Sequence, residues 1–212
     1  MEKKSRTIRA MLGRAVWRHR GPADKRGGGP AQAEAAMDNL LLGPEAPVNH
    51  TIALMRAAPK GGRILDGARP APQAFFSVDP RGEVEGNFTT GGGNVIGLKY
   101  AVRKAPDWLA LHLVLGGVDL SDGAVFGVVC KSRAAEATTV RLCLRSARVD
   151  GFVDAFFDKH LVAFAEASTH LDLLRIPARD DIPGQAGWRE LILFFQPAPA
   201  ELEIEDLRVF IV

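Results

Sequence analysis

The sequence predicts an all-β protein, built as an antiparallel β-sandwich, and three observations support this. Short segments of alternating apolar and polar residues recur along the chain, separated roughly every ten residues by turn signals rich in Gly, Pro and Asp. Apolar residues at helical spacing are scarce after residue 37. One segment is apolar on both alternating faces, which is typical of a strand covered on both sides. Such a series of short strands is characteristic of sandwiches.

Length and composition describe an ordinary globular chain that is long enough for a sandwich core. The 212 residues are 47% hydrophobic and 25% charged, with a formal net charge of +2. This nearly neutral balance gives no reason to expect a nucleic-acid partner. No apolar run reaches the length of about eighteen residues that indicates a transmembrane helix. We therefore expect a cytoplasmic protein.

The first 36 residues differ from the rest of the chain. Residues 1–26 carry nine basic side chains against two acidic ones. Residues 5–19 predict a short amphipathic helix, with Ile8, Met11, Leu12 and Ala15 on its apolar face. Residues 21–36 are rich in Gly, Pro and Ala and predict a linker. We expect a partly helical or disordered extension over 1–36, either a solvated tail or a contact to a membrane surface or protein partner, and a sandwich domain over 37–212.

Several segments of the predicted domain have the pattern of strands. They are Trp108–Leu115, Val125–Lys131, Thr138–Arg145, His170–Ile176 and Trp188–Phe195. The first is apolar on both faces, so we expect it to be buried on both sides. In the third, residues 140, 142 and 144 point inward and the residues between them point outward. The Gly-rich run 89–97 lacks the Gly-Lys-Ser/Thr of a phosphate-binding loop and predicts a turn or bulge.

The last segment, residues 200–212, changes phase within the strand. Leu202 and Ile204 share one face, but the next inward apolar residue is Leu207 rather than residue 206. A slip of one residue moves side chains to the opposite face unless an extra residue is accommodated. The pattern therefore predicts a β-bulge at Glu205-Asp206.

The ending WRELILFFQPAPAELEIEDLRVFIV resembles the closing hairpin of galactose-binding-like jelly rolls, the fold of many carbohydrate-binding modules. An aromatic residue opens the penultimate strand, and Glu203–Val209 matches the alternating final strand of those domains. The resemblance implies a jelly-roll sandwich that binds sugar, docks to protein or has a structural role. It also implies that a structural calcium ion, if bound, would use Glu83, Glu85 and Asp206.

Sugar binding requires aromatic faces flanked by polar groups. The tryptophans and the single tyrosine provide few such faces, and we expect Trp108 and Trp188, which open strands, to pack in the core. Loops are therefore the expected location of a glycan site. The candidate ligand-binding residues are Asp119, Asp122, Arg148, Asp150, Arg179, Asp180 and Asp181.

The stretch from Gly151 to Leu174 concentrates histidine, carboxylate and phenylalanine side chains. Ser168, His170 and Asp172 are two residues apart on a strand, which separates neighbours by about 6.5 to 7 Å and excludes a hydrogen-bonded triad. If two neighbouring strands pair here, a polar patch forms from Asp158, His160, His170 and Asp172. Such a patch is either an ordinary sheet surface or a divalent-metal site. We expect no catalytic residue.

Cys130 and Cys143 lie on consecutive predicted strands, about equally far from the turn between them. This spacing predicts that they face each other across a hairpin, and a cytoplasmic setting favours two free thiols. The histidines are scattered and no CxxC pair occurs, so the sequence predicts no zinc site and no cofactor.

Three functions remain consistent with the sequence, the least favoured of which is an enzyme that uses Asp158, His160 and His170. The first is a non-catalytic binding module that recognises a carbohydrate or glycoconjugate through the sandwich. The alternative is an interaction or assembly protein, whose basic N-terminal arm contacts a membrane surface or a partner protein.

Overall fold

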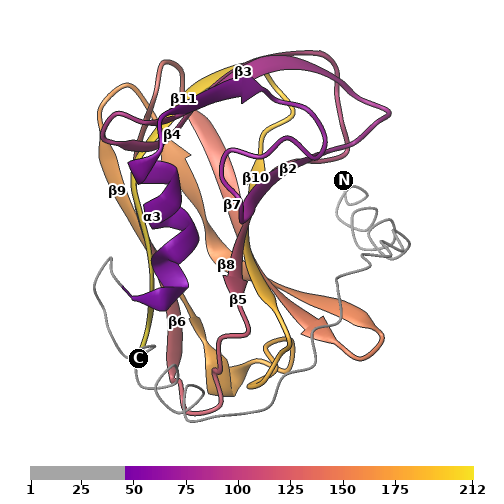
Figure 1. Cartoon of the computed structure of the whole chain (residues 1–212), viewed down its shortest axis with the longest axis vertical. Helices are drawn as coiled ribbons and strands as arrows, with labels where there is room; N and C mark the ends of the chain where they lie inside the picture. Colours follow the sequence, from indigo (N-terminus) through magenta and orange to yellow (C-terminus); the bar gives the residue numbers. More distant parts are fainter. Residues whose placement is uncertain (1–45) are drawn as a thin grey trace, which may run out of the picture. The chain divides into compact units, whose positions relative to one another are not determined.

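A computed structural model describes residues 46–212, which form two antiparallel sheets packed face to face (Figure 1). The six-stranded sheet has the order β1 (Lys60–Arg63), β3 (Glu83–Gly91), β4 (Asn94–Lys104), β11 (Ala200–Ile211), β6 (Val125–Ala134), β9 (Ser168–Arg175). The five-stranded sheet has the order β2 (Ala74–Val78), β5 (Leu109–Gly116), β10 (Arg189–Phe195), β7 (Thr138–Arg148), β8 (Gly151–Ala163). The predicted sandwich is confirmed. The N-terminal helix and linker lie outside the described residues.

Each strand predicted from alternation is present, and the core lies between the two sheets. Val140, Leu142 and Leu144 of β7 are fully buried there, as their spacing predicted. Strand β5 is buried on both faces, because Ala110 and His112 on its other face are also covered. The Gly-rich run forms the turn between β3 and β4, where Gly91, Gly92 and Gly93 have positive φ.

The predicted bulge in the last strand is confirmed. The register of β11 against β6 shifts between Ile204 and Asp206, and Leu207 then returns to the core. The extra residue turns Asp206 outward, where it pairs with Arg56 and Arg208. The bulge therefore keeps the apolar residues on either side of it in one core.

The helix α3 (His50–Ala57) was not predicted. It lies against the edge of the sandwich and packs on β3, β4 and β5, burying Thr51, Ile52 and Met55 (Figure 1). A 3-10 turn, η2 (Pro47–Asn49), precedes it. The side-chain amide of Asn49 accepts from the backbone N–H of Val209 and donates to its carbonyl. No helix within residues 46–212 has the length and apolar character needed to cross a membrane.

Two predicted neighbour relations are wrong. Strands β8 and β9 follow each other in sequence but belong to different sheets, and so do β6 and β7. Cys130 therefore lies in the six-stranded sheet and Cys143 in the five-stranded sheet, both buried and free, rather than opposite each other in a hairpin. Consecutive strands of a jelly roll often cross between sheets, and alternation within each strand carries no information about this crossing.

Candidate functional site

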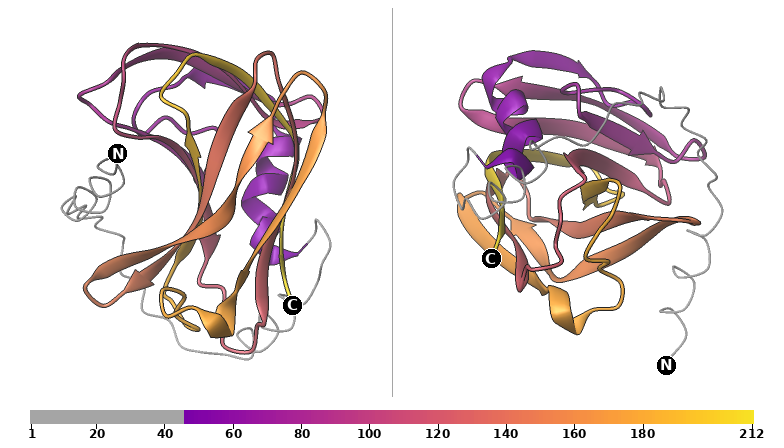
Figure 2. Two further views of the ribbon diagram at one scale, coloured as in Figure 1. Left: turned by 180° about the vertical axis from the view of Figure 1, so that it is seen from behind. Right: turned by 60° about the horizontal axis from the view of Figure 1, so that its bottom comes forward.

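The side chains of the five-stranded sheet that point away from the core form a surface that we call the outer face. It comprises Phe75, Ser77, Trp108, Ala110, His112, Glu190, Ile192, Phe194, Arg141, Cys143, Arg145, Phe152, Asp154, Phe156 and His160. The sheet bends around this face, and the β7–β8 hairpin extends beyond the other strands (Figures 1 and 2). Aromatic and charged groups thus alternate across a single curved surface.

The centre of the outer face is small and apolar. Ala110, Cys143 and Ile192 are fully buried there, with Phe156 and Phe194 packed against them at a ring separation of 5.9 Å. Burial raises the pKa of the Cys143 thiol, with a smaller contribution from the Asp154 carboxylate. A thiol held in its neutral form is a packing group rather than a nucleophile.

One side of the outer face is formed by β2, β5 and β10. Phe75 stacks on the imidazole of His112, with ring centroids 4.6 Å apart and an angle of 16° between the planes. The Nδ1 atom of His112 lies 2.8 Å from a carboxylate oxygen of Glu190. The carboxylate and the phenylalanine together fix the orientation of the imidazole.

The other side is formed by β7 and β8. Arg145 donates Nε–H and Nη2–H to the two carboxylate oxygens of Asp154, at 2.7 and 2.8 Å. Its guanidinium carbon lies 3.8 Å from the ring centroid of Phe152, and that of Arg141 lies 3.9 Å from Phe156. Burial opposes the charge of Arg145, but the ion pair outweighs it and raises its pKa. These are cation–π contacts across neighbouring strands.

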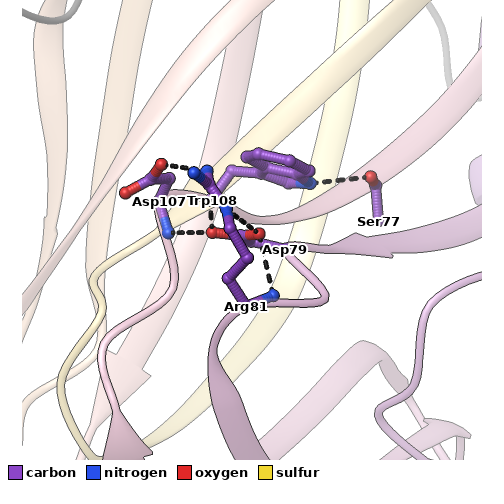
Figure 3. Close-up of polar contacts among 5 residues, drawn as sticks. All are labelled: Ser77, Asp79, Arg81, Asp107 and Trp108. Carbon is purple, nitrogen blue, oxygen red and sulfur yellow. Dashed lines mark hydrogen bonds and ion pairs between the residues drawn. The ribbon is translucent and has the colours of Figure 1, made fainter. Parts of the chain in front are cut away.

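A network of polar contacts surrounds Trp108, which lies on the outer face just before β5 (Figure 3). The indole N–H of Trp108 donates to Ser77 Oγ at 3.0 Å, and the ring is half-buried rather than packed in the core. The buried Asp79 carboxylate accepts the backbone N–H groups of Arg81 (3.0 Å) and Asp107 (2.9 Å), and the Arg81 guanidinium (3.1 Å). The network joins the turn after β2 to the turn before β5, which positions Trp108.

Asp79→Asn is expected to lower the free energy of unfolding at pH 7 by about 1–3 kcal/mol, because a buried charged acceptor is lost. Burial of Asp79 opposes its ionisation, but the hydrogen bonds from Asp107 and Arg81 outweigh burial and lower its pKa. Its contribution is therefore present above the unfolded-state pKa of about 3.9 and is lost as the pH falls through the lower folded-state pKa. Urea denaturation of the wild type and of Asp79→Asn between pH 7 and pH 3 measures this change in the free energy of unfolding.

The control for this variant is Asp122→Asn, which changes an exposed loop carboxylate. The difference between wild type and Asp79→Asn should shrink toward low pH, whereas Asp122→Asn should match the wild type throughout. A pH-independent difference for Asp79→Asn would show that the carboxylate charge is not what stabilises these turns.

The loop residues predicted to bind ligand fall into separate places. Arg179 donates to both oxygens of Asp181, at 2.8 and 2.6 Å, and Arg148 donates to the backbone carbonyl of Asp180 at 2.9 Å. These four residues are thus brought together, largely through contacts with one another. Asp119 instead accepts from the Ser121 N–H and from Gln185 in a neighbouring loop. Asp122 and Asp150 are exposed.

The predicted polar patch does not form, because β8 and β9 lie in different sheets. Asp158 and His160 are exposed on β8. Asp172 is buried and accepts the backbone N–H of Lys159 at 2.8 Å, so it links the edges of the two sheets. Burial lowers the pKa of His170, helped by Lys159 and opposed by Asp172.

The predicted calcium ligands do not converge either. Glu83 and Glu85 lie on β3, which β4 separates from β11, and Glu85 pairs with Arg103 at 3.0 Å. Asp206 is paired with Arg56 and Arg208. Within residues 46–212, no group of three His, Cys, Asp or Glu side chains is arranged to hold a metal ion.

Sequence reasoning missed the outer face as a site, although its signal is present. Arg141, Cys143 and Arg145 alternate outward on one strand, and Phe152, Asp154 and Phe156 alternate outward on the next. An aromatic and charged repeat of period two indicates a patterned sheet face. Only the tertiary structure shows that these two strands pair and that β10 and β5 extend the same face.

No family model matches the chain, and no curated protein matches it. Solved structures similar to it include three carbohydrate-binding modules, and the similarity is one of fold. A family 4 module has a TM-score of 0.47 at 10% identity, covering 71% of this chain and 95% of that one. A family 11 module from Clostridium thermocellum, in complex with a β-1,3-1,4-mixed-linked tetrasaccharide, has a TM-score of 0.46 at 10% identity, covering 72% of this chain and 96% of that one. A family 22 xylan-binding domain from Paenibacillus barcinonensis has a TM-score of 0.42 at 11% identity, covering 73% of this chain and 97% of that one.

Proposed function

We propose that this protein is a carbohydrate-binding module that holds a glycan chain along the outer face of the five-stranded sheet. The observation that carries this proposal is the alternation of aromatic rings with hydrogen-bonding side chains across the whole face. Phe75 lies on β2 at one edge and Phe152 on β8 at the other. The polar groups between them, such as Glu190 and Asp154, come from β10 and β8.

This combination suits a sugar better than other small ligands. The C–H faces of a pyranose pack on aromatic rings, while its hydroxyl groups need donors and acceptors placed around them. The pairs of His112 with Glu190 and of Arg145 with Asp154 supply such groups, with side chains only 8–14% exposed and already oriented by their own contacts. Preorganised polar groups bind with less loss of side-chain entropy.

The width of the face indicates an oligosaccharide. Strands β2 and β8 are four strand spacings apart in the sheet, which corresponds to about 19 Å. A monosaccharide cannot contact both Phe75 and Phe152 across that distance. Affinity is therefore expected to rise with chain length until the glycan spans the face.

Calorimetric titration of residues 1–212 with mixed-linked β-glucan, xylan, galactan and polygalacturonate oligosaccharides tests the proposal. Phe152→Ala should weaken binding of the best glycan about tenfold or more, which corresponds to about 1.4 kcal/mol. Phe152 is 39% exposed, so its truncation should leave the core intact.

The matched control is Phe210→Ala, which removes an aromatic ring from the outward side of β11 in the other sheet. It should bind as the wild type does. If no oligosaccharide binds the wild type, or if Phe210→Ala weakens binding as much as Phe152→Ala does, the outer face is not a glycan site.

A further inference from the structure

Two arginines on the outer face repeat the same arrangement. Arg141 and Arg145 lie four residues apart on β7, and each guanidinium stacks on a phenylalanine of β8. The distances to the ring centroids are 3.9 Å for Arg141 on Phe156 and 3.8 Å for Arg145 on Phe152. Stacking leaves the in-plane N–H groups of a guanidinium free to bind acceptors at its edge.

The two arginines differ in what lies at that edge. Arg145 gives two N–H groups to the carboxylate of Asp154, and both side chains are only 14% exposed. Arg141 is exposed, and no carboxylate among residues 46–212 forms an ion pair with it. Arg145 therefore has both an aromatic ring at its face and a carboxylate at its edge. Arg141 has the ring at its face but no carboxylate from residues 46–212 at its edge.

A bulge in β8 explains the difference. Asp154 is opposite Arg145 and Phe156 is opposite Cys143, so continuation of this register would place Asp158 opposite Arg141. The register instead shifts between Arg141 and Cys143, and the residue opposite Arg141 is His160. The Asp158 carboxylate is displaced toward Arg179, at 3.9 Å, and its side chain is 86% exposed. The bulge thus leaves the edge of Arg141 open.

We propose that Arg141 and His160 bind a carboxylate carried by the glycan, so that the ligand of the outer face is an acidic, uronate-containing polysaccharide. This inference rests on the proposed function. The carboxylate would take the place at Arg141 that Asp154 occupies at Arg145, receiving paired N–H groups from a guanidinium already held on Phe156. Paired donation to a planar carboxylate is the geometry that arginine favours. His160, opposite Arg141, adds an imidazole and no negative charge.

A matched pair of ligands tests this on the full chain. Oligogalacturonate and its methyl ester differ in the charge of the carboxyl group and share the same sugar ring. The wild type should bind the acid at least tenfold more tightly than the ester. Arg141→Gln should remove that preference, whereas Arg103→Gln, an exposed arginine on β4 of the other sheet, should retain it. Alginate and glucuronate oligosaccharides, each paired with its ester, extend the test to other uronates.

A second variant tests the site by adding a carboxylate instead of removing the guanidinium. His160→Asp supplies an internal carboxylate opposite Arg141 and repeats the pair of Arg145 with Asp154. It should reduce acid binding about as much as Arg141→Gln does, because the internal carboxylate occupies the guanidinium. Both positions are exposed, and because Arg141→Gln loses only the contact with Phe156, the thermal unfolding temperature of each variant should stay within about 4 °C of the wild type.

The outcomes separate this inference from the proposed function. Equal binding of acid and ester by the wild type, or unchanged acid binding by Arg141→Gln and His160→Asp, would overturn it. A neutral glycan whose binding is lost in Phe152→Ala but kept in Arg141→Gln would leave the proposed function standing and remove the acidic ligand. Binding of sulfated polysaccharide alone, with no uronate bound, would also overturn the carboxylate assignment.

Discussion

Arg189→Met is expected to lower the free energy of unfolding by about 3–5 kcal/mol, because four buried or partly buried acceptors lose their donor at about 1–3 kcal/mol each. Arg189 begins β10 and is fully buried. Its guanidinium donates to the carbonyls of Val118 (2.8 Å), Pro183 (2.6 Å) and Gly184 (2.7 Å), and to Ser146 Oγ. The side chain therefore ties two loops to the end of the five-stranded sheet.

The charge of Arg189 persists at neutral pH despite burial. Burial lowers its pKa to about 10, and the nearby Asp119 carboxylate opposes part of that effect. Lysine at this position would carry the charge but could not reach all four acceptors, so Arg189→Lys should show an intermediate loss.

Denaturant unfolding followed by circular dichroism measures both variants. Arg175→Met, which changes an exposed arginine on β9, serves as the control and should stay within about 0.5 kcal/mol of the wild type. A loss below about 1 kcal/mol for Arg189→Met would mean that water replaces the guanidinium at these carbonyls.

Gly86→Ala is expected to lower the free energy of unfolding by about 1–3 kcal/mol through overpacking. Gly86 lies on β3 opposite Tyr100 of β4. A Cβ added there would lie 2.6 Å from the carbonyl oxygen of Lys99 and 2.8 Å from the Cα atom of Tyr100. Both are backbone atoms of a paired strand, so no side-chain rotation relieves the contact, and the two strands must separate.

Gly61→Ala provides the control from the neighbouring strand β1. A Cβ there meets only the carbonyl oxygen of Phe88, at 3.7 Å, which is an ordinary contact. Thermal unfolding should show a lower midpoint for Gly86→Ala and little change for Gly61→Ala. Equal midpoints for the two variants would show that β3 and β4 accommodate the methyl group without separating.

In the proposed function, the paired aromatic and charged groups are what the outer face offers to a saccharide. Guanidinium groups lie against the rings of Phe152 and Phe156, and an imidazole lies against that of Phe75. Such a face presents nitrogen donors edge-on beside aromatic surface, a combination suited to hydroxyl and carboxylate groups on a saccharide. A face of bare rings would favour neutral sugars instead.

The alternation of apolar and polar residues along the sequence was sufficient to predict the strands and one β-bulge within them. The alternation around Leu142 predicted β7, and the phase change after Ile204 predicted the bulge in β11. Both depend on which face each side chain occupies, and that is decided between residues adjacent in sequence. The helix α3 lacked such a signal, because eight residues are too few for a helical period to stand out.

The candidate site required the tertiary structure. Sequence neighbours suggested that Asp158, His160, His170 and Asp172 share a surface, but the chain crosses between the sheets after β8. Because of this crossing, Asp172 is buried where the edges of the two sheets meet, whereas His160 is exposed on the outer face. Pairing between distant strands decides such positions, and no pattern within a single strand encodes its partner.

The sequence alone therefore determined the class of the fold, the inward and outward residues of its strands and the bulge in β11, because each follows from a period of two along a single strand. The tertiary structure decided which strands share a sheet, which phenylalanine each arginine stacks on and which residue lies opposite Arg141. Those relations arise from hydrogen-bond register between separate strands, and the bulge in β8 changes that register.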